Sequence, residues 1–448
     1  MSEASNPIRG DLRALVRISL PLMLFLFCEA FTSFCERIFL SYHSIDAIHA
    51  SLNASYLATI FQSPCVAIGA MAQVFVGFYQ GSNEYKRIGP CVWQLIWFSF
   101  LSFLITFPLS FLASSWYFKD TIIQKAGMEY FTMLALGNFL FPLSTALSSF
   151  YLGRGKTLLV TTLMVASYAL HLALSWLLIF GVEGVIPALG AKGAALAKCM
   201  SLGVLCTIFW GCFLTRKNRE IYGTDFWQFS PRVLWHYMRP GMVRAFGFLS
   251  SKICWVAISY VIIKKGGKYL DALTIGGTVI TFLVFIAMGL YKAILTIASN
   301  LIGAEKSSEI WNLCRSFIVY TIGVAITLTI PLIFFPDTLI YFFDSSSKET
   351  FKQTFRDINH WIWLYMLALT LQTSFCAVLV ALQDLKFQLY CYLFLWPISF
   401  VPIYFGLSLG EWQADKLWAI MALENIAFML FFFIRLRQKK LEKQFLAT

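Results

Sequence analysis

Apolar residues along the chain form long continuous runs rather than the short periods of a soluble protein. Stretches of about 20 residues or more with almost no charge recur from end to end. At 1.5 Å per residue, a helix of that length crosses the ~30 Å hydrocarbon core of a bilayer. The pattern predicts spans at 16–42, 51–80, 91–116, 130–152, 157–181, 193–214, 241–263, 272–302, 315–335, 358–381, 387–407 and 416–434. We therefore expect an all-α integral membrane protein with about 12 transmembrane helices.

The chain also repeats itself once. The longest polar connection, 215–240, separates six predicted spans from six. Three segments of the first half resemble segments of the second: ISLPLMLFLF (18–27) and YMRPGMVRAF (237–246), YQGSNEYKRI (79–88) and LIGAEKSSEI (301–310), LGRGKT (152–157) and LQDLKF (382–387). Internal duplication of this kind is typical of secondary transporters. We expect two six-helix lobes, 1–214 and 241–448, related by a parallel repeat and joined by a cytoplasmic linker at 215–240.

Charge is scarce and unevenly placed. Only 13% of the 448 residues are charged, and the net charge is +12. The two tails and the even-numbered loops carry about twice as many lysines and arginines as the odd-numbered loops. Because basic loops stay on the cytoplasmic side, both termini are predicted to be cytoplasmic. The basic clusters are expected to meet anionic lipid headgroups of the plasma membrane, the bacterial inner membrane, rather than nucleic acid.

Motifs for enzyme chemistry are missing. GRGKT (153–157) ends like a nucleotide-binding loop, but Phe150 occupies the position where that motif requires glycine. No G-x-S-x-G, H-E-x-x-H or C-x-x-C pattern occurs, and the 11 cysteines lie scattered, mostly in apolar segments. We expect neither an enzyme nor a cofactor or metal site.

Ionisable residues inside the predicted spans are the informative ones, because each costs about 2.5–3.5 kcal/mol on insertion scales. Glu29 and Glu36 lie two helical turns apart on one stripe of the first span. Glu36 is predicted to be a titrating cavity acid, and the alternative is a satisfied structural ion pair.

The fifth and sixth spans add a histidine and a lysine. His171 has Ser167 and Ser175 one turn away on either side, which suits a proton relay or a neutral hydrogen-bonded core histidine. Lys198 lies among small residues that let its helix approach neighbours closely, so we expect a partner for its ammonium group.

The seventh and eighth predicted spans carry basic residues and no acidic residue. Lys252 and Lys292 are expected to line a cavity that attracts anions, and Glu424 in the last span is a candidate partner for either lysine. Glu29, Lys252, Lys292 and Glu424 are the candidate residues of a substrate cavity.

These segments resemble the multidrug and toxic compound extrusion (MATE) family, within the superfamily that also holds lipid-linked oligosaccharide flippases. The resemblance rests on Pro21 to Glu36 in the first span, on GFYQGSNEYKRI (77–88), on YLGRGKT (151–157) and on LLIFGVEGVIPALGAKGAALA (177–197). It implies twelve helices in two lobes around a V-shaped cavity, and export of small organic solutes by alternating access. It also implies that Glu36 takes the place of the acid that couples proton flow in many members.

The chain departs from the family pattern at several of these positions. Many relatives have Asn and Asp one turn apart on the fifth span, where this chain has His171 and Ser175, and a threonine where it has Lys198. Family sodium sites use acids in the seventh and tenth spans, where this chain has Lys252 and Leu369. Proton coupling is therefore favoured over sodium, with Glu36, His171, Ser175 and Lys198 as the ion-coupling residues.

Three functions remain open from the sequence. The first is a proton-coupled exporter of small organic compounds. The second is a flippase of anionic lipid-linked precursors that binds phosphate with Lys198, Lys252 and Lys292. The third is a membrane scaffold that transports nothing. No obligate protein partner is indicated, so we expect a monomer that meets only its solute and membrane lipid.

Overall fold

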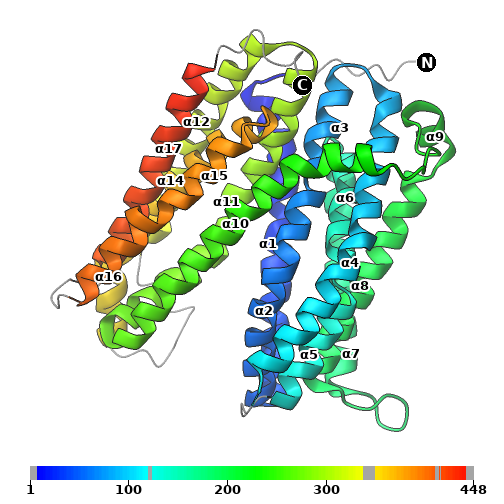
Figure 1. The fold of residues 1–448 in the computed structure, drawn as a ribbon. Coiled ribbons are helices and arrows are strands. Elements are labelled where there is room, and N and C mark those ends of the chain that lie inside the picture. Colours follow the sequence, from blue (N-terminus) through cyan, green and yellow to red (C-terminus); the bar gives the residue numbers. More distant parts are fainter. Residues whose placement is uncertain (1–7, 120–123, 336–348, 409–412, 414, 440–448) are drawn as a thin grey trace. The chain divides into compact units, whose positions relative to one another are not determined.

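The chain is helical through nearly all of the part described by the computed structural model, which is residues 8–119, 124–335, 349–408, 413 and 415–439 (Figure 1). The helices are α1 (Leu12–His43), α2 (Ile45–Gly69), α3 (Met71–Gly81), η1 (Tyr85–Arg87), α4 (Ile88–Tyr117), α5 (Gln124–Leu136), α6 (Leu140–Leu152), α7 (Thr157–Phe180), α8 (Gly190–Phe213), α9 (Arg216–Tyr222), α10 (Pro231–Lys265), α11 (Gly267–Gly303), α12 (Ser307–Thr329), η2 (Ile330–Phe334), α14 (Glu349–Ala381), α15 (Leu385–Leu395), η3 (Trp396–Phe400), α16 (Val401–Ser408) and α17 (Lys416–Gln438). Among the described residues, 11 candidate spans, or up to 12 if α5 and α6 form one bent span, can cross a membrane. The predicted all-α membrane fold is confirmed.

Two predicted boundaries differ from the structure. The predicted span 130–152 is broken into α5 and α6, which meet at an angle of 40°. The linker 215–240 is partly helical, since it contains α9 and the first turns of α10. Helix α10 begins at Pro231, because the fixed φ of proline suits the first position of a helix.

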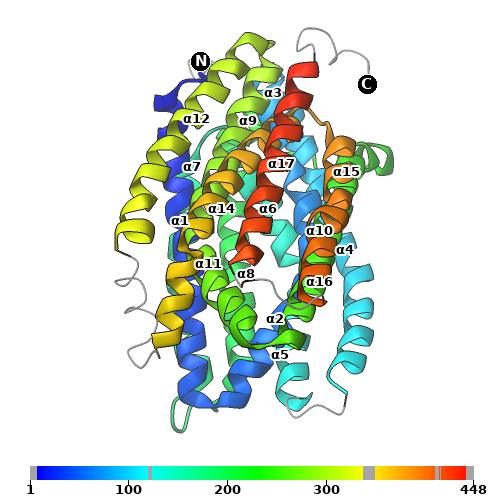
Figure 2. The ribbon, with the colours of Figure 1, turned by 90° about the vertical axis from the view of Figure 1, so that its left-hand side faces the viewer.

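Packing divides the chain into two compact units, Leu24–Phe246 and Met1–Met23 with Gly247–Thr448. In the first unit α2, α4, α5, α6, α7 and α8 run side by side (Figure 1). In the second unit α14 packs along both α11 and α17 (Figure 2). The expected lobes 1–214 and 241–448 stay a prediction, because the packing units follow a different division in which two helices are shared.

Helix α1 is the first shared helix. Its boundary between units falls after Met23, two residues beyond Pro21. Before the boundary, Tyr320 of α12 donates a hydrogen bond to Sδ of Met23 at 3.3 Å, and Ser316 donates to the carbonyl of Gly10 at 3.0 Å. After the boundary, α1 carries Glu29 and Glu36 in the other unit.

Helix α10 is the second shared helix, and its boundary falls after Phe246. Before the boundary, the hydroxyl of Tyr237 lies 3.1 Å from that of Tyr79 in the first unit. After it, Trp396 donates to Oγ of Ser250 at 3.4 Å in the second unit. Each half of the sequence thus begins with a helix that starts in one packing unit and continues into the other.

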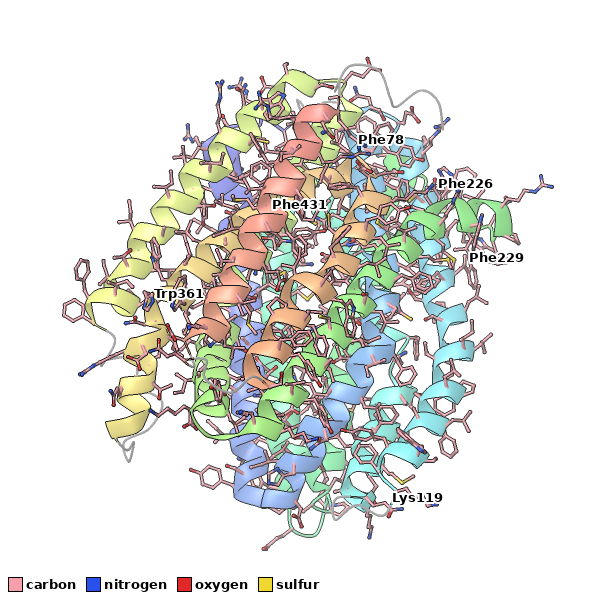
Figure 3. The ribbon with its side chains drawn as sticks, turned by 60° about the vertical axis from the view of Figure 1, so that its left-hand side comes forward. Phe78, Lys119, Phe226, Phe229, Trp361 and Phe431 are labelled. Carbon is pink, nitrogen blue, oxygen red and sulfur yellow. The ribbon has the colours of Figure 1, made fainter. Side chains whose placement is uncertain are left out.

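The segment between α9 and α10 is held against α4 by three side chains. Trp93 donates to the carbonyl of Thr224 at 2.8 Å, Gln94 to that of Gln228 at 2.7 Å and Trp97 to that of Trp227 at 3.0 Å. These bonds satisfy backbone carbonyls that no regular structure pairs. In Figure 3 the exposed side chains of Phe226 and Phe229 mark this segment, at the end of the first unit opposite to Lys119.

The repeat is visible in the backbone of four helix-to-helix turns. Each has one residue with left-handed φ, at Asn83 (62°), Gly155 (74°), Glu305 (57°) and Gln383 (55°). The following residue donates its N–H to the carbonyl five positions back at 2.9–3.0 Å, in the pairs Glu84–Tyr79, Lys156–Tyr151, Lys306–Leu301 and Asp384–Leu379. This is the Schellman arrangement of helix C-termini. The two halves therefore share these turns even where their residue types differ.

The turn geometry also corrects one sequence alignment. It pairs Asn83 with Glu305, as the sequence segments predict. It pairs Gly155 with Gln383, whereas the predicted match of LGRGKT with LQDLKF places Gly155 opposite Leu385. That alignment is therefore wrong by two residues.

The fourth of these turns is joined to the last helix by charge. Oδ2 of Asp384 accepts a hydrogen bond from Nε of Arg435 at 2.8 Å and lies 3.1 Å from Nζ of Lys439. Burial raises the pKa of the Asp384 carboxyl, whereas the hydrogen bond from Arg435 and the charge of Lys439 lower it by more, so that this pKa lies below its ordinary value.

We predict that Gly155→Ala lowers the free energy of unfolding by about 1 kcal/mol, because a Cβ is disfavoured at left-handed φ. Gln383→Gly at the equivalent turn should raise the free energy of unfolding, by a smaller amount. Thermal unfolding of the purified protein in detergent measures both. An unchanged midpoint for Gly155→Ala would contradict the turn assignment.

We predict that Asp384→Asn lowers the free energy of unfolding by about 1–2 kcal/mol at neutral pH. The loss is smaller than for a fully buried ion pair, because Arg435 is more than a third exposed and solvent screens its charge. The folded carboxyl has the lower pKa, so its contribution is present above the unfolded pKa of about 3.9 and is lost as the pH falls through the folded pKa. Thermal unfolding against pH measures this loss, which Asp384→Asn should lack. Asp357→Asn, at an exposed position on α14, is the matched control.

Candidate functional site

The first unit gathers its ionisable span residues around Glu36. This residue lies on the buried face of α1, whereas Phe34 and Ile38 on either side of it are exposed. Glu36 itself is 7% exposed. A carboxylate inside a span needs protein partners, because the hydrocarbon supplies none.

Two side chains meet the Glu36 carboxylate directly. Nε2 of His171, from α7, lies 3.1 Å from Oε2 of Glu36. The hydroxyl of Tyr130, from α5, donates a hydrogen bond to Oε1 at 3.3 Å. His171 is 6% exposed and Tyr130 is 1% exposed. The carboxylate is therefore held on both oxygens by groups buried from solvent.

Tyr130 connects the acid to a further helix. Its hydroxyl also lies 3.2 Å from Oγ of Ser55 on α2. A tyrosine hydroxyl has one proton and can also accept a hydrogen bond. Tyr130 therefore donates to Glu36 while it accepts from Ser55, and the chain of bonds orders three helices around one carboxylate.

Lys198 supplies the positive charge of the site. Its ammonium group on α8 interacts electrostatically with Glu36 and lies 5.9 Å from the centroid of the Phe141 ring. The sequence predicts a partner for this lysine, and Glu36 and Phe141 fit that expectation. Burying an ammonium group is costly without a counter-charge, so the acid and the lysine depend on each other.

The serines flanking His171 have different surroundings. Ser167 donates to the carbonyl of Ser201 at 3.2 Å and so ties α7 to α8. Ser175 is fully buried, and within the described part of the chain its Oγ has no hydrogen-bond partner. A buried hydroxyl of this kind offers an unused donor and acceptor one turn from His171.

Glu29 is arranged differently from Glu36. Its side chain is exposed, and the hydroxyl of Tyr168 on α7 hydrogen-bonds to its carboxylate. The two acids on the predicted stripe of α1 thus both face α7, but only Glu36 has a basic partner among the described residues.

The candidates in the second unit are spread over several helices. Lys252 is exposed on α10 and Lys292 is partly buried on α11. Glu424 on α17 accepts a hydrogen bond from Ser399, and its carboxylate forms no ion pair with a described residue. The roles predicted for these three residues stay predictions.

Sequence reasoning missed Tyr130, Tyr168 and Ser55. The chain has 19 tyrosines, and a tyrosine in a span carries no charge that would single it out. The signal that could have found two of them is their place in the sequence. Tyr168 lies one turn from His171 on the fifth predicted span, and Tyr130 lies at the start of the fourth. Among the described residues, no group of three or more His, Cys, Asp or Glu lies close enough to hold a metal ion.

This arrangement can hold or release a proton. The carboxylate, the imidazole and the ammonium group form a network in which neutralising one member changes the energy of the others. Together with Tyr130, these side chains come from α1, α5, α7 and α8, so the network connects four helices.

The chain matches one known protein family, and it does so at two places in the sequence. The model of the MatE family matches residues 21–177 and again residues 245–405, which together are more than half of the chain. The internal duplication predicted from the sequence is confirmed by this double match, and so is the resemblance to the MATE family.

Individual relatives are distant but extensive. The protein named "Probable multidrug resistance protein NorM" of Thermotoga maritima is 21% identical over 75% of this chain and 73% of its own length. A multidrug resistance MATE family transporter in its outward-facing conformation has a TM-score of 0.86, with 16% identity over 97% of both chains. A MOP superfamily transporter from Pyrococcus furiosus has a TM-score of 0.85, with 16% identity over 98% of both chains.

We predict that Tyr130→Phe lowers stability by about 1–2 kcal/mol, because it leaves the buried Glu36 carboxylate one donor short. Tyr117→Phe is the matched control, since the hydroxyl of Tyr117 makes one exposed hydrogen bond to Asn53 at 3.4 Å. Thermal unfolding in detergent compares the two. Equal midpoints for both variants would show that the Tyr130 hydroxyl does not support the acid.

Proposed function

Because the chain belongs to the MatE family of transporters, we propose that it is a proton-coupled antiporter that exports small organic compounds or drugs across the plasma membrane. The observation that carries the proposal is the buried Glu36 carboxylate, in contact with His171 and Tyr130 and close to the charge of Lys198. The names of the relatives, which describe multidrug resistance, support the substrate class. We further propose a bacterial inner membrane location with both termini in the cytoplasm.

The proposed coupling rests on charge balance at Glu36. In its ionised form the carboxylate offsets the positive charge of Lys198. A proton taken up by Glu36 removes that balance. Breaking a buried ion pair on one side costs about 3–5 kcal/mol, since the other charge is left uncompensated. Even a linked change of one pKa unit is worth about 1.4 kcal/mol.

Helix α1 gives this local event a route to the rest of the protein. Residues 24–43 of α1 carry the acid in one unit, and the part before Met23 belongs to the other unit. Pro21 removes one backbone hydrogen bond at the junction, which makes the helix easier to bend there. We propose that protonation of Glu36 shifts α1 between two arrangements and so links proton entry to alternating access.

Proton coupling is proposed over sodium because of the groups around the acid. The Lys198 ammonium group beside the Glu36 carboxylate repels a metal cation, whereas the carboxylate can take up a proton. The flippase alternative requires Lys198, Lys252 and Lys292 to bind phosphate together. The charge of Lys198 interacts with the Glu36 carboxylate instead, which favours the coupling role for this lysine.

We predict that Glu36→Gln abolishes transport driven by a pH gradient, because glutamine cannot exchange a proton, while the protein still folds. The measurement is proton movement from reconstituted vesicles on addition of cationic, neutral and anionic compounds in turn. Glu36→Asp should retain part of the activity. Glu220→Gln, an exposed acid on α9 outside the candidate site, is the matched control.

Two outcomes would overturn the proposal. Undiminished gradient-driven transport by Glu36→Gln would remove this acid from the coupling mechanism. Absence of substrate-dependent proton movement in the unmodified protein would favour the scaffold or an uncoupled flippase.

A further inference from the structure

A second carboxyl inside a candidate span lies in the unit formed by Met1–Met23 and Gly247–Thr448. Glu424 is partly buried near the middle of α17, and its Oε2 accepts a hydrogen bond from the hydroxyl of Ser399. Ser399 is fully buried. Unlike Glu36, Glu424 has no lysine, arginine or histidine against it among the described residues. An ionised carboxylate left inside a span without a cation costs several kcal/mol, so this acid has a reason to bind a proton.

The span that contains Ser399 departs from a regular α-helix at this serine. Ser399 lies in η3 (Trp396–Phe400), a π-helical turn between α15 and α16. Pro397 lies inside this turn and Pro402 just after it. Each proline removes one backbone hydrogen bond, and π-helical turns occur often at functional sites. The Ser399–Glu424 bond therefore links a titratable group to a turn of a candidate span in which backbone hydrogen bonds are missing.

The groups around Glu424 come from several helices. Tyr365 of α14 and Cys254 of α10 are the titratable side chains that interact with its charge. The other elements packed against α17, namely α11, η3 and α16, place no charged group against this carboxylate in the described residues. Tyr365 is itself fixed by an edge contact with the Trp418 ring at 5.6 Å.

The position of Glu424 parallels that of Glu36 in one respect. Glu36 lies on α1, the first helix shared by the two packing units. Glu424 faces α10, the second shared helix, where Cys254 interacts with it. One turn earlier on α10, Ser250 accepts the hydrogen bond from Trp396 of η3. The π-helical turn is thus tied to α10 through Ser250 and to α17 through Glu424.

We propose that Glu424 and Ser399 form a second proton-binding site, whose occupancy controls how firmly the π-helical turn is held against α17. The proposal extends the proton coupling proposed above to the second unit. The ionised carboxylate accepts a strong charge-assisted hydrogen bond from Ser399, and proton uptake converts it to a weaker bond between neutral groups. A proton needs no cavity, so the close packing around Glu424 is compatible with this ligand.

The test is an infrared pH titration of carboxyl groups in the full-length protein, without substrate and without a gradient. Glu424→Gln should remove one titrating carboxyl band that Glu36→Gln leaves in place. Ser399→Ala should shift the midpoint of that same band, and Glu424→Asp should retain a titrating band. Glu220→Gln, an exposed acid on α9, is the control for a band that reports only surface ionisation.

The outcomes separate this proposal from the coupling at Glu36. If Glu424→Gln leaves the titration unchanged while Glu424→Asp folds normally, the second proton site does not exist. If sodium ions alter the Glu424 band at fixed pH and protons do not, the site binds a metal cation instead and the proposal is wrong. Gradient-driven transport that survives Glu36→Gln would refute the coupling mechanism at Glu36. The infrared band of Glu424 would still decide independently whether the second proton site exists.

Discussion

A carboxylate placed inside a membrane span must be paired or neutralised, and the first unit is organised around this requirement. The Glu36 carboxylate on α1 contacts Tyr130 and His171 and interacts with the charge of Lys198. These three partners come from three further helices, α5, α7 and α8. Removing one member would leave another buried and uncompensated. The same network that holds the helices together is the one through which we propose that a proton changes their packing.

The second unit meets the same requirement with other chemistry. Its partly buried acid, Glu424, accepts a hydrogen bond from the hydroxyl of Ser399, and its charged residues Lys252 and Lys292 lie on other helices. The two halves share a backbone plan, visible in the turns at Asn83 and Glu305 and at Gly155 and Gln383. Duplication thus preserved the hydrogen bonding of the backbone, which depends little on residue type, while the polar side chains diverged.

The sequence predicted the fold well because long apolar runs have one main physical solution in a bilayer, the helix. It also singled out Glu36, His171 and Lys198, which the structure brings together, since ionisable residues stand out in apolar spans; their role in coupling stays a prediction. It could not identify Tyr130 or Ser55, because uncharged hydroxyl groups are common and their partners depend on how helices rotate about their axes. Nor could it predict that the packing units divide α1 after Met23 and α10 after Phe246, because that division depends on contacts between residues far apart in the chain.

The shared helix α1 has a consequence for biosynthesis. The chain is made from its N-terminus, and domains generally fold as they emerge from the ribosome. The unit Leu24–Phe246 can complete its packing once α10 has begun to emerge. The part of α1 before Met23, however, must wait for partners such as Ser316 and Tyr320, which are synthesised some three hundred residues later. Through most of translation this segment has lipid or the insertion machinery as its neighbour, so it reaches its native contacts long after it is made.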